Sequence, residues 1–84
     1  MTRFWPDGEP VMAEVDADGS PARFVWRGQT HVVRTIANRW RLDEDWWRAR
    51  VRREYFKLTT EGGLLVILYR DAAQSAWRLQ RVYD

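Results

Sequence analysis

The sequence predicts an all-β fold, a small antiparallel meander of six strands that is strongly twisted or curled into a partly open barrel. No window of the chain shows a 3.6-residue apolar period long enough for a typical helix. Short stretches rich in Val, Phe, Trp, Tyr and Thr recur instead between turn residues. The predicted strands are residues 11–15, 22–27, 30–42, 47–60, 64–69 and 76–83.

The length of the chain predicts a single small domain. A chain of 84 residues buries only about 60% of the surface that its unfolded form exposes, so its core is modest. Six Trp, three Tyr and three Phe suit such a core, because each large ring removes much apolar surface from water. We expect residues 1–10, with two prolines and a glycine, to form an amino-terminal arm, and residues 11–84 to form the β domain.

Two irregularities are expected in the middle of the chain. Residues 43–47, DEDWW, predict either one helical turn, whose amino-terminal dipole would favour the three acids, or a simple turn. In residues 47–60 the apolar parity changes between Val51 and Phe56. One extra residue within 52–54 would return both sets to the core, which predicts a β-bulge there. Residues 30–42 also change parity, at Val33, so we expect that strand to bend or bulge.

The stretch 64–69, LLVILY, is apolar on both faces and is therefore expected to lie centrally in the sheet. Its outer face must be covered, either by the amino-terminal arm or by another chain, such as a protein partner or a second copy in a homodimer. The residues of this candidate packing face are Phe4, Trp5, Leu65, Ile67 and Tyr69.

Residues suited to catalysis or metal binding are scarce. There is no Cys, which excludes disulfides and thiolate zinc sites, and His31 is the only imidazole. The acids Asp43, Glu44 and Asp45 lack the spaced ligands and glycine of a calcium loop. The sequence therefore predicts a protein without enzymatic activity, metal or cofactor. Its longest apolar run, residues 64–69, is far shorter than the roughly 20 residues of a membrane span, and a cytoplasmic location is expected.

Basic residues concentrate in one predicted strand, within WWRARVRREYFKL at residues 46–58. Thirteen of the 14 basic residues of the chain are Arg, although the formal net charge is only +2. On an extended strand, alternate arginines would lie about 6.6–6.8 Å apart, close to the phosphate spacing of a stretched single strand of nucleic acid. The candidate contacts are Trp46, Arg48, Arg50, Arg52, Arg53 and Tyr55. The alternative is an ordinary solvated face that acids on neighbouring strands, such as Glu14, Glu54 and Asp71, neutralise.

Residues 52–84 resemble the carboxy-terminal segment of ImuB-type proteins, Y-family DNA polymerase homologues of bacterial mutasomes. The shared elements are Arg53 with Tyr55 and Phe56, the Gly62-Gly63 hairpin, Leu68-Tyr69-Arg70, and Trp77 with Leu79. Upstream, residues 21–33 and 45–48 are also similar to that segment, and the chain resembles short stand-alone members of the same uncharacterised domain family. The chain departs from the pattern at its end, QRVYD, where the segment commonly has a His-Gly pair.

The resemblance implies a non-catalytic adaptor module in DNA-damage tolerance or translesion synthesis, with a partner among the DNA-repair polymerases. It carries no established functional residues across. Direct binding of single-stranded DNA or RNA through the arginine-rich strand is the alternative, and it predicts an affinity that falls steeply with salt.

Overall fold

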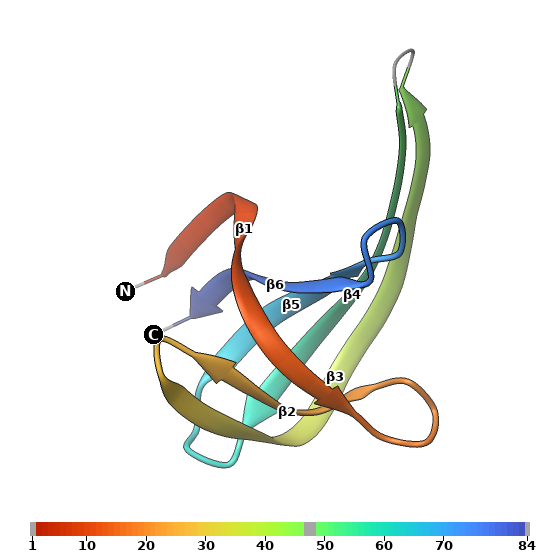
Figure 1. The fold of residues 1–84 in the computed structure, drawn as a ribbon. Coiled ribbons are helices and arrows are strands. Elements are labelled where there is room, and N and C mark those ends of the chain that lie inside the picture. Colours follow the sequence, from red (N-terminus) through yellow and green to blue (C-terminus); the bar gives the residue numbers. More distant parts are fainter. Residues whose placement is uncertain (1, 47–48, 84) are drawn as a thin grey trace.

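A computed structural model describes residues 2–46 and 49–83, with only the backbone of Trp46 and Ala49 (Figure 1). The six strands are β1 (Arg3–Val15), β2 (Pro21–Trp26), β3 (Gln29–Trp46), β4 (Ala49–Thr60), β5 (Leu65–Asp71) and β6 (Ala76–Tyr83). Each strand pairs in antiparallel fashion with the next, and β1 also pairs with β6, so the strands close into a ring. The predicted all-β meander of six strands is confirmed.

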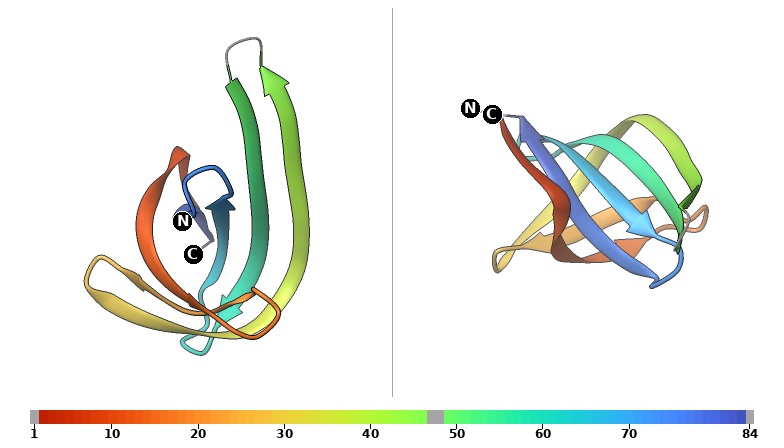
Figure 2. Two further views of the ribbon diagram at one scale, coloured as in Figure 1. Left: turned by 45° about the vertical axis from the view of Figure 1, so that its right-hand side comes forward. Right: turned by 90° about the horizontal axis from the view of Figure 1, so that it is seen from above.

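The ring has one long projection. Figure 2 shows that the far ends of β3 and β4 extend well beyond the other strands as a two-stranded hairpin. The reason lies in the pairing, because β3 contacts β2 only through residues 29–32, whereas residues 33–46 pair with β4. Two register shifts occur on β3, which leave Arg34 and Ala37 as extra residues opposite β4. The bend expected in this strand is therefore present.

The first strand begins earlier than the sequence analysis placed it, at Arg3 rather than at residue 11. Arg3 and Phe4 pair with Val82 and Arg81 of β6, the register then breaks, and pairing resumes at Glu9. Gly8, with φ of 74°, lies in the break and allows the chain to turn sharply there. Residues 3–10 are thus part of the ring.

The helical or simple turn predicted at residues 43–47 is wrong for the residues described. Asp43 and Asp45 continue β3 in extended conformation, directly opposite Arg52 and Arg50 of β4. Cross-strand pairs of opposite charge stabilise a sheet, so the acids lengthen the hairpin instead of ending it. Trp47 lies outside the described residues.

The β-bulge predicted within residues 52–54 is also wrong. Residues 53–59 of β4 pair with β5 in unbroken register, and the irregularities of the β3–β4 ladder lie on β3. The parity change has another cause, because both faces of β4 are buried. Phe56 and Leu58 face the inside of the ring, whereas Tyr55 packs on the outside.

The core accordingly consists of two clusters on opposite faces of β4 and β5. The inner cluster fills the ring and comprises Phe24, Trp26, Phe56, Leu58, Val66, Leu68, Leu79 and Val82. The outer cluster is smaller and comprises Tyr55, Ile67 and Tyr69, with Leu42 and Tyr83 packed against it. As predicted, β5 is central and covered on both sides.

Candidate nucleic-acid interface

The arginine-rich strand β4 divides its side chains between two faces of the sheet. By strand alternation, Arg50 and Arg52 share the face of Phe56, whereas Arg53 lies on the opposite face with Tyr55. Arg48 and the side chain of Trp46 lie outside the described residues. The predicted contacts therefore do not form one continuous track.

Three arginines on the face of Phe56 contact carboxylates, whereas Arg52 on the same face forms no ion pair among the described residues. Arg50 Nε lies 3.0 Å from Asp43 Oδ1 and 3.6 Å from Asp45 Oδ1. The hydrogen bond from Arg50 lowers the pKa of Asp43, and that carboxylate raises the pKa of Arg50. Arg39 and Arg41 both contact Glu54 Oε2, at 3.0 and 3.4 Å. Among the described residues, Arg50 is the β4 arginine that has ion-pair partners, and these are Asp43 and Asp45. Glu14 and Glu54 pair with arginines of β2 and β3 instead.

The opposite face combines cations with aromatic rings. The guanidinium of Arg53 lies 4.6 Å from the ring centroid of Tyr69, and its Nη1 donates a 3.3 Å hydrogen bond to Tyr55 Oη, which raises the pKa of Arg53. Lys57 lies over Tyr83 at 5.5 Å, and Arg81 lies over Phe4 at 4.7 Å and over Tyr83 at 5.6 Å. We call this surface the cation–aromatic face; it comprises Arg53, Lys57, Arg78, Arg81, Phe4, Trp40, Tyr55, Tyr69 and Tyr83.

The cations of this face differ from Arg39, Arg41 and Arg50 in their lack of ion pairs among the described residues. Among residues 2–46 and 49–83, none of its four cations forms an ion pair with a carboxylate. Arg53 and Arg78 donate hydrogen bonds instead to Tyr55 Oη and to the carbonyl oxygen of Gly8.

A row of aromatic rings crosses this face from β3 to β5. Trp40 and Tyr55 stack with centroids 5.2 Å apart and an interplanar angle of 2°, and Tyr69 follows at 5.3 Å from Tyr55. Trp40 is 38% exposed, whereas Tyr55 and Tyr69 are buried. Trp40, Lys57 and Arg81 were not among the residues predicted from the sequence. The register of β3 against β4 places Trp40 opposite Tyr55, and that of β5 against β6 places Arg81 opposite Ile67. Lys57 lies two residues from Tyr55 on the same face of β4.

The expected packing face of β5 is partly covered by the kink in β1. Tyr69 Oη donates a 2.8 Å hydrogen bond to the carbonyl oxygen of Asp7, and a Cβ on Gly8 would lie 2.7 Å from Tyr69 Oη. Burial raises the pKa of Tyr69. The five residues proposed for this face do not stay together. Phe4 lies under Arg81, Trp5 packs on the inner cluster 5.9 Å from Trp26, and Leu65 is half-buried.

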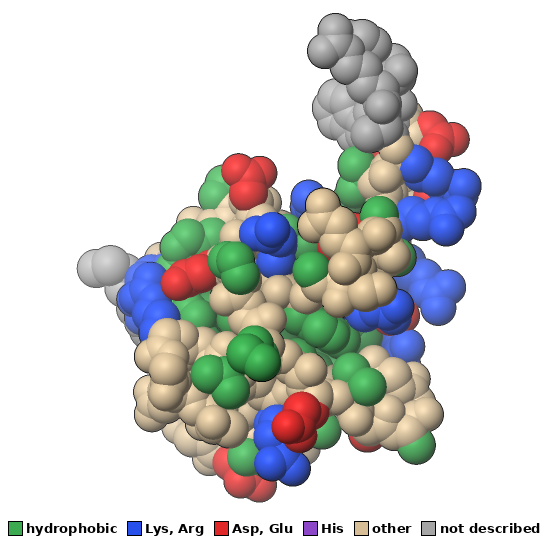
Figure 3. Space-filling view, viewed as in Figure 1, with side chains coloured by type: hydrophobic (Ala, Val, Ile, Leu, Met, Phe, Trp, Pro, Cys, Tyr) green, Lys and Arg blue, Asp and Glu red, His purple; other side chains and the backbone are tan. Residues whose placement is uncertain are grey.

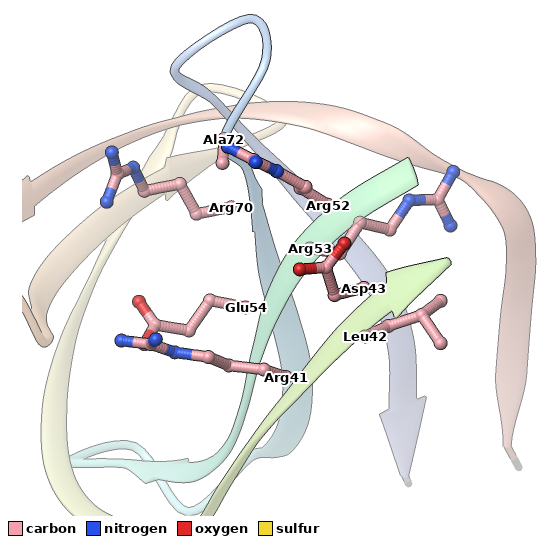
Figure 4. A pocket seen from close by; sticks show the side chains of 8 residues that line it. All are labelled: Arg41, Leu42, Asp43, Arg52, Arg53, Glu54, Arg70 and Ala72. Atoms are coloured by element: carbon pink, nitrogen blue, oxygen red, sulfur yellow. The ribbon is translucent and has the colours of Figure 1, made fainter. Parts of the chain in front are cut away.

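A cavity of about 400 Å³ lies between the β3–β4 hairpin and the turn after β5. It is lined by Arg41, Leu42, Asp43, Arg52, Arg53, Glu54, Arg70 and Ala72. Figure 4 shows Arg41 and Glu54 pointing to one side of the hairpin, and Leu42 and Arg53 to the other. The lining mixes both signs of charge. In the part of the chain that the structure describes, no group of three His, Cys, Asp or Glu side chains could hold a metal ion.

His31 has a structural environment. Its ring stacks on Phe24 at 5.1 Å and lies 6.2 Å from Trp26, next to the inner cluster. No described side chain hydrogen-bonds its buried Nε2 atom. These contacts are those of a packed histidine.

Apolar side chains are exposed on the outer side of β1, β2 and β3. Met12 is 77% exposed and lies directly opposite Val25, and Val32 and Val15 are exposed nearby on the same strands. We call these four residues the apolar patch; Val32 lies opposite Arg23, whose ion pair with Glu14 is exposed on the same face. Figure 3 shows small groups of hydrophobic side chains on this side of the molecule, with charged side chains close to them. Among the described residues, no helix is long and apolar enough to cross a membrane.

The comparison with protein families gives one match. The model of the family described as "Domain of unknown function (DUF6504)" matches residues 5–84, so the chain belongs to this family. No curated protein and no solved structure matches the chain. The resemblance to ImuB-type segments is not tested by these comparisons and stays a prediction.

Proposed function

We propose that this member of the DUF6504 family is a non-catalytic binding module whose cation–aromatic face binds single-stranded nucleic acid. The observation that carries the proposal is the set of four cations that lack carboxylate partners in the described chain and lie over or beside aromatic rings. Sites for single strands combine a positive surface, which follows the phosphates, with rings on which bases stack. Both parts are present on one sheet face.

The arrangement of the face suits a single strand of nucleic acid that crosses from β4 to β6. Arg53 and Lys57 are four residues apart on β4, about 13 Å along the strand, and Arg81 lies opposite Ile67 on the far side of β5. Trp40 offers an exposed ring at one end and Phe4 at the other. When a phosphate draws Arg81 away from Phe4, that ring becomes free to stack on a base.

Fluorescence anisotropy of labelled single-stranded DNA and RNA, measured over a range of salt concentrations, tests this proposal. We expect saturable binding whose logarithmic salt slope decreases by about 1.4 in Lys57→Gln/Arg81→Gln, because each lost phosphate contact removes about 0.7. Trp40→Ala should weaken binding by roughly 5- to 150-fold through lost stacking.

The matched control is Arg23→Gln/Arg27→Gln, which removes two arginines that already have ion-pair partners in Glu14 and Glu9. Its salt slope should stay close to that of the wild type. Absence of saturable binding at low salt, or an equal loss in the control, would refute the proposal.

A second candidate function, a protein adaptor in DNA-damage tolerance, is favoured by the apolar patch. Met12, which is 77% exposed, lies opposite the exposed Val25, so this face offers two adjacent apolar side chains that a protein partner would cover. The resemblance of residues 21–84 to ImuB-type segments suggests DNA-repair polymerases as partners. Amide chemical shifts recorded with a purified polymerase homologue would test it. Perturbations centred on Met12 and Val25 that persist at high salt support the adaptor function, and their absence contradicts it.

A further inference from the structure

The free edge of β3 leads to an inference that goes beyond nucleic-acid binding. In the described chain, the backbone of residues 34–46 forms backbone hydrogen bonds only in its ladder with β4. The other edge of this segment is therefore unpaired, except that Asn38 Oδ1 accepts a hydrogen bond from the N–H of Arg39. An unpaired edge is a template for another strand.

The charges along this edge are arranged in a self-complementary order. Alternation places Arg39, Arg41, Asp43 and Asp45 on one face of β3, two cations followed by two anions. Suppose that the same segment of a second copy pairs with it in antiparallel fashion, with Leu42 opposite Leu42. Arg41 then lies opposite Asp43 of the other copy, and Arg39 opposite Asp45, and the two-fold symmetry repeats both pairs.

Contacts within one chain leave charge available for such pairing. Arg39 and Arg41 share the carboxylate of Glu54, and Arg39 also donates a 3.4 Å hydrogen bond to Ser20 Oγ, so the two cations have one ion-pair partner among the described residues. Asp43 and Asp45 share Arg50, and although Arg52 lies opposite Asp43 it forms no ion pair among the described residues. The side chains of Arg41 and Asp45 are 79% and 83% exposed.

We propose that two copies of this chain associate through the free edges of β3, in an antiparallel register centred on Leu42. The backbone ladder covers residues 40–44, and the Arg39 and Asp45 side chains pair at its ends. The two rings then share one continuous sheet through β3 of each copy. The contact is small and charged, so the dimer is a weak one that forms reversibly with rising concentration.

Complementary charge reversal, followed by sedimentation equilibrium without nucleic acid, tests the pairing. Arg41→Glu alone and Asp43→Arg alone each place like charges opposite one another twice, and each should raise the dimer Kd about tenfold or more. Mixing the two variants restores opposite charges at both pairs, so the mixture should dimerise. Arg23→Glu on β2 is the control and should leave the Kd unchanged, and circular dichroism should show the same fold in all variants.

The register can be measured separately, because the chain contains no Cys. Leu42→Cys should form a disulfide-linked dimer rapidly on mild oxidation, since the two thiols face each other. Glu44→Cys places its two thiols about 13 Å apart along the strands and should cross-link far more slowly.

Three results would overturn the proposal. The first is a wild-type chain that remains monomeric at all concentrations, and the second is a mixture of Arg41→Glu and Asp43→Arg that does not dimerise. The third is equal rates of disulfide cross-linking for Leu42→Cys and Glu44→Cys. Because no nucleic acid is present, these outcomes leave the function of the cation–aromatic face untouched.

Discussion

The two faces of β4 and β5 are both buried, but different interactions bury them. The inner cluster is formed by aliphatic and aromatic side chains alone, with Phe56, Leu58, Val66 and Leu68 completely inaccessible. The outer cluster has only three buried members, covered by Arg53, by the kink at Gly8 and by one hydrogen bond to Asp7. Stability of the inner face therefore depends on apolar area, and that of the outer face on a few specific contacts.

The arginines show the same division. Arg41 and Arg50 form ion pairs on the face of Phe56, and Arg39 there both pairs with Glu54 and lies 5.1 Å from the ring centroid of Phe56. Arg53 and Arg81 lie over rings on the outer face and form no ion pair among the described residues. Exposed ion pairs contribute little to stability. A cation over a ring instead covers apolar surface while its charge stays available to a ligand. The outer face thus combines a structural role with the binding role that we propose for it.

Truncation of a side chain in the inner cluster should lower the free energy of unfolding the most, and it should show the largest difference between the two faces. Phe56→Ala should lower the free energy of unfolding by about 3–5 kcal/mol, enough to unfold a domain this small, since it leaves a cavity in the ring. Ile67→Ala on the outer face should cost about 2 kcal/mol, because solvent and mobile side chains can fill the space. Urea denaturation followed by Trp fluorescence measures both values. Equal costs would show that the outer cluster is packed as tightly as the inner one.

The kink in β1 gives the next largest effect. In Gly8→Ala the new Cβ would lie 2.6 Å from Arg78 Cβ and 2.7 Å from Tyr69 Oη, at a φ of 74°. Strain and overpacking together should lower the free energy of unfolding by about 2–4 kcal/mol.

The control for this substitution is Gly63→Ala, which has a φ of 92° but no atom within 4 Å of its new Cβ. It should cost only the backbone strain, about 1–2 kcal/mol. If both variants lost the same stability, the kink would not press on Tyr69 as the structure indicates.

The comparison of faces also shows what the sequence could and could not predict. Alternation and turn residues were enough to place six antiparallel strands, and the apolarity of LLVILY was enough to place β5 at the centre. The parity change in β4 was misread, because a strand with two buried faces and a strand with a bulge have the same pattern of residues. The acids at 43–45 were misread because their partners, Arg50 and Arg52, lie on the returning strand.

Fewer features of the candidate site than of the fold could be predicted from the sequence. Arg53 and Tyr55 were selected, but Trp40 and Arg81 were not, since each lies far from β4 in the chain and is brought to this face by strand register. A shift of one residue moves every side chain to the other face. The sum of small register irregularities on β1, β3 and β6 could therefore not be foreseen from composition or spacing.

Ionisation of Tyr69 should make the stability of the outer face depend on pH. Burial raises its pKa, so its folded-state value lies above the unfolded value of about 10. The neutral phenol therefore contributes stability that is fully present below pH 10 and is lost as the pH rises through the folded-state pKa.

Tyr69→Phe should cost about 1–2 kcal/mol at neutral pH, through loss of the hydrogen bond to Asp7. Above pH 10, the free energy of unfolding of this variant should also decrease less steeply with pH than that of the wild type. Denaturation at several pH values between 8 and 11 measures this slope. Identical slopes in the two proteins would contradict the buried position of the phenol.

The smallest effect distinguishes the two kinds of arginine directly. Arg53→Gln removes the cation above Tyr69 and the hydrogen bond to Tyr55, and it uncovers part of the outer cluster. We expect it to lower the free energy of unfolding by about 1 kcal/mol. Arg23→Gln removes an exposed ion pair with Glu14 and should change stability by less than about 0.5 kcal/mol.

High salt should reduce the effect of Arg23→Gln and leave that of Arg53→Gln nearly intact, because contact with a ring is screened less than an exposed ion pair. If salt abolished both effects equally, Arg53 would be an ordinary surface charge, and the structural role assigned to the cation–aromatic face would fail.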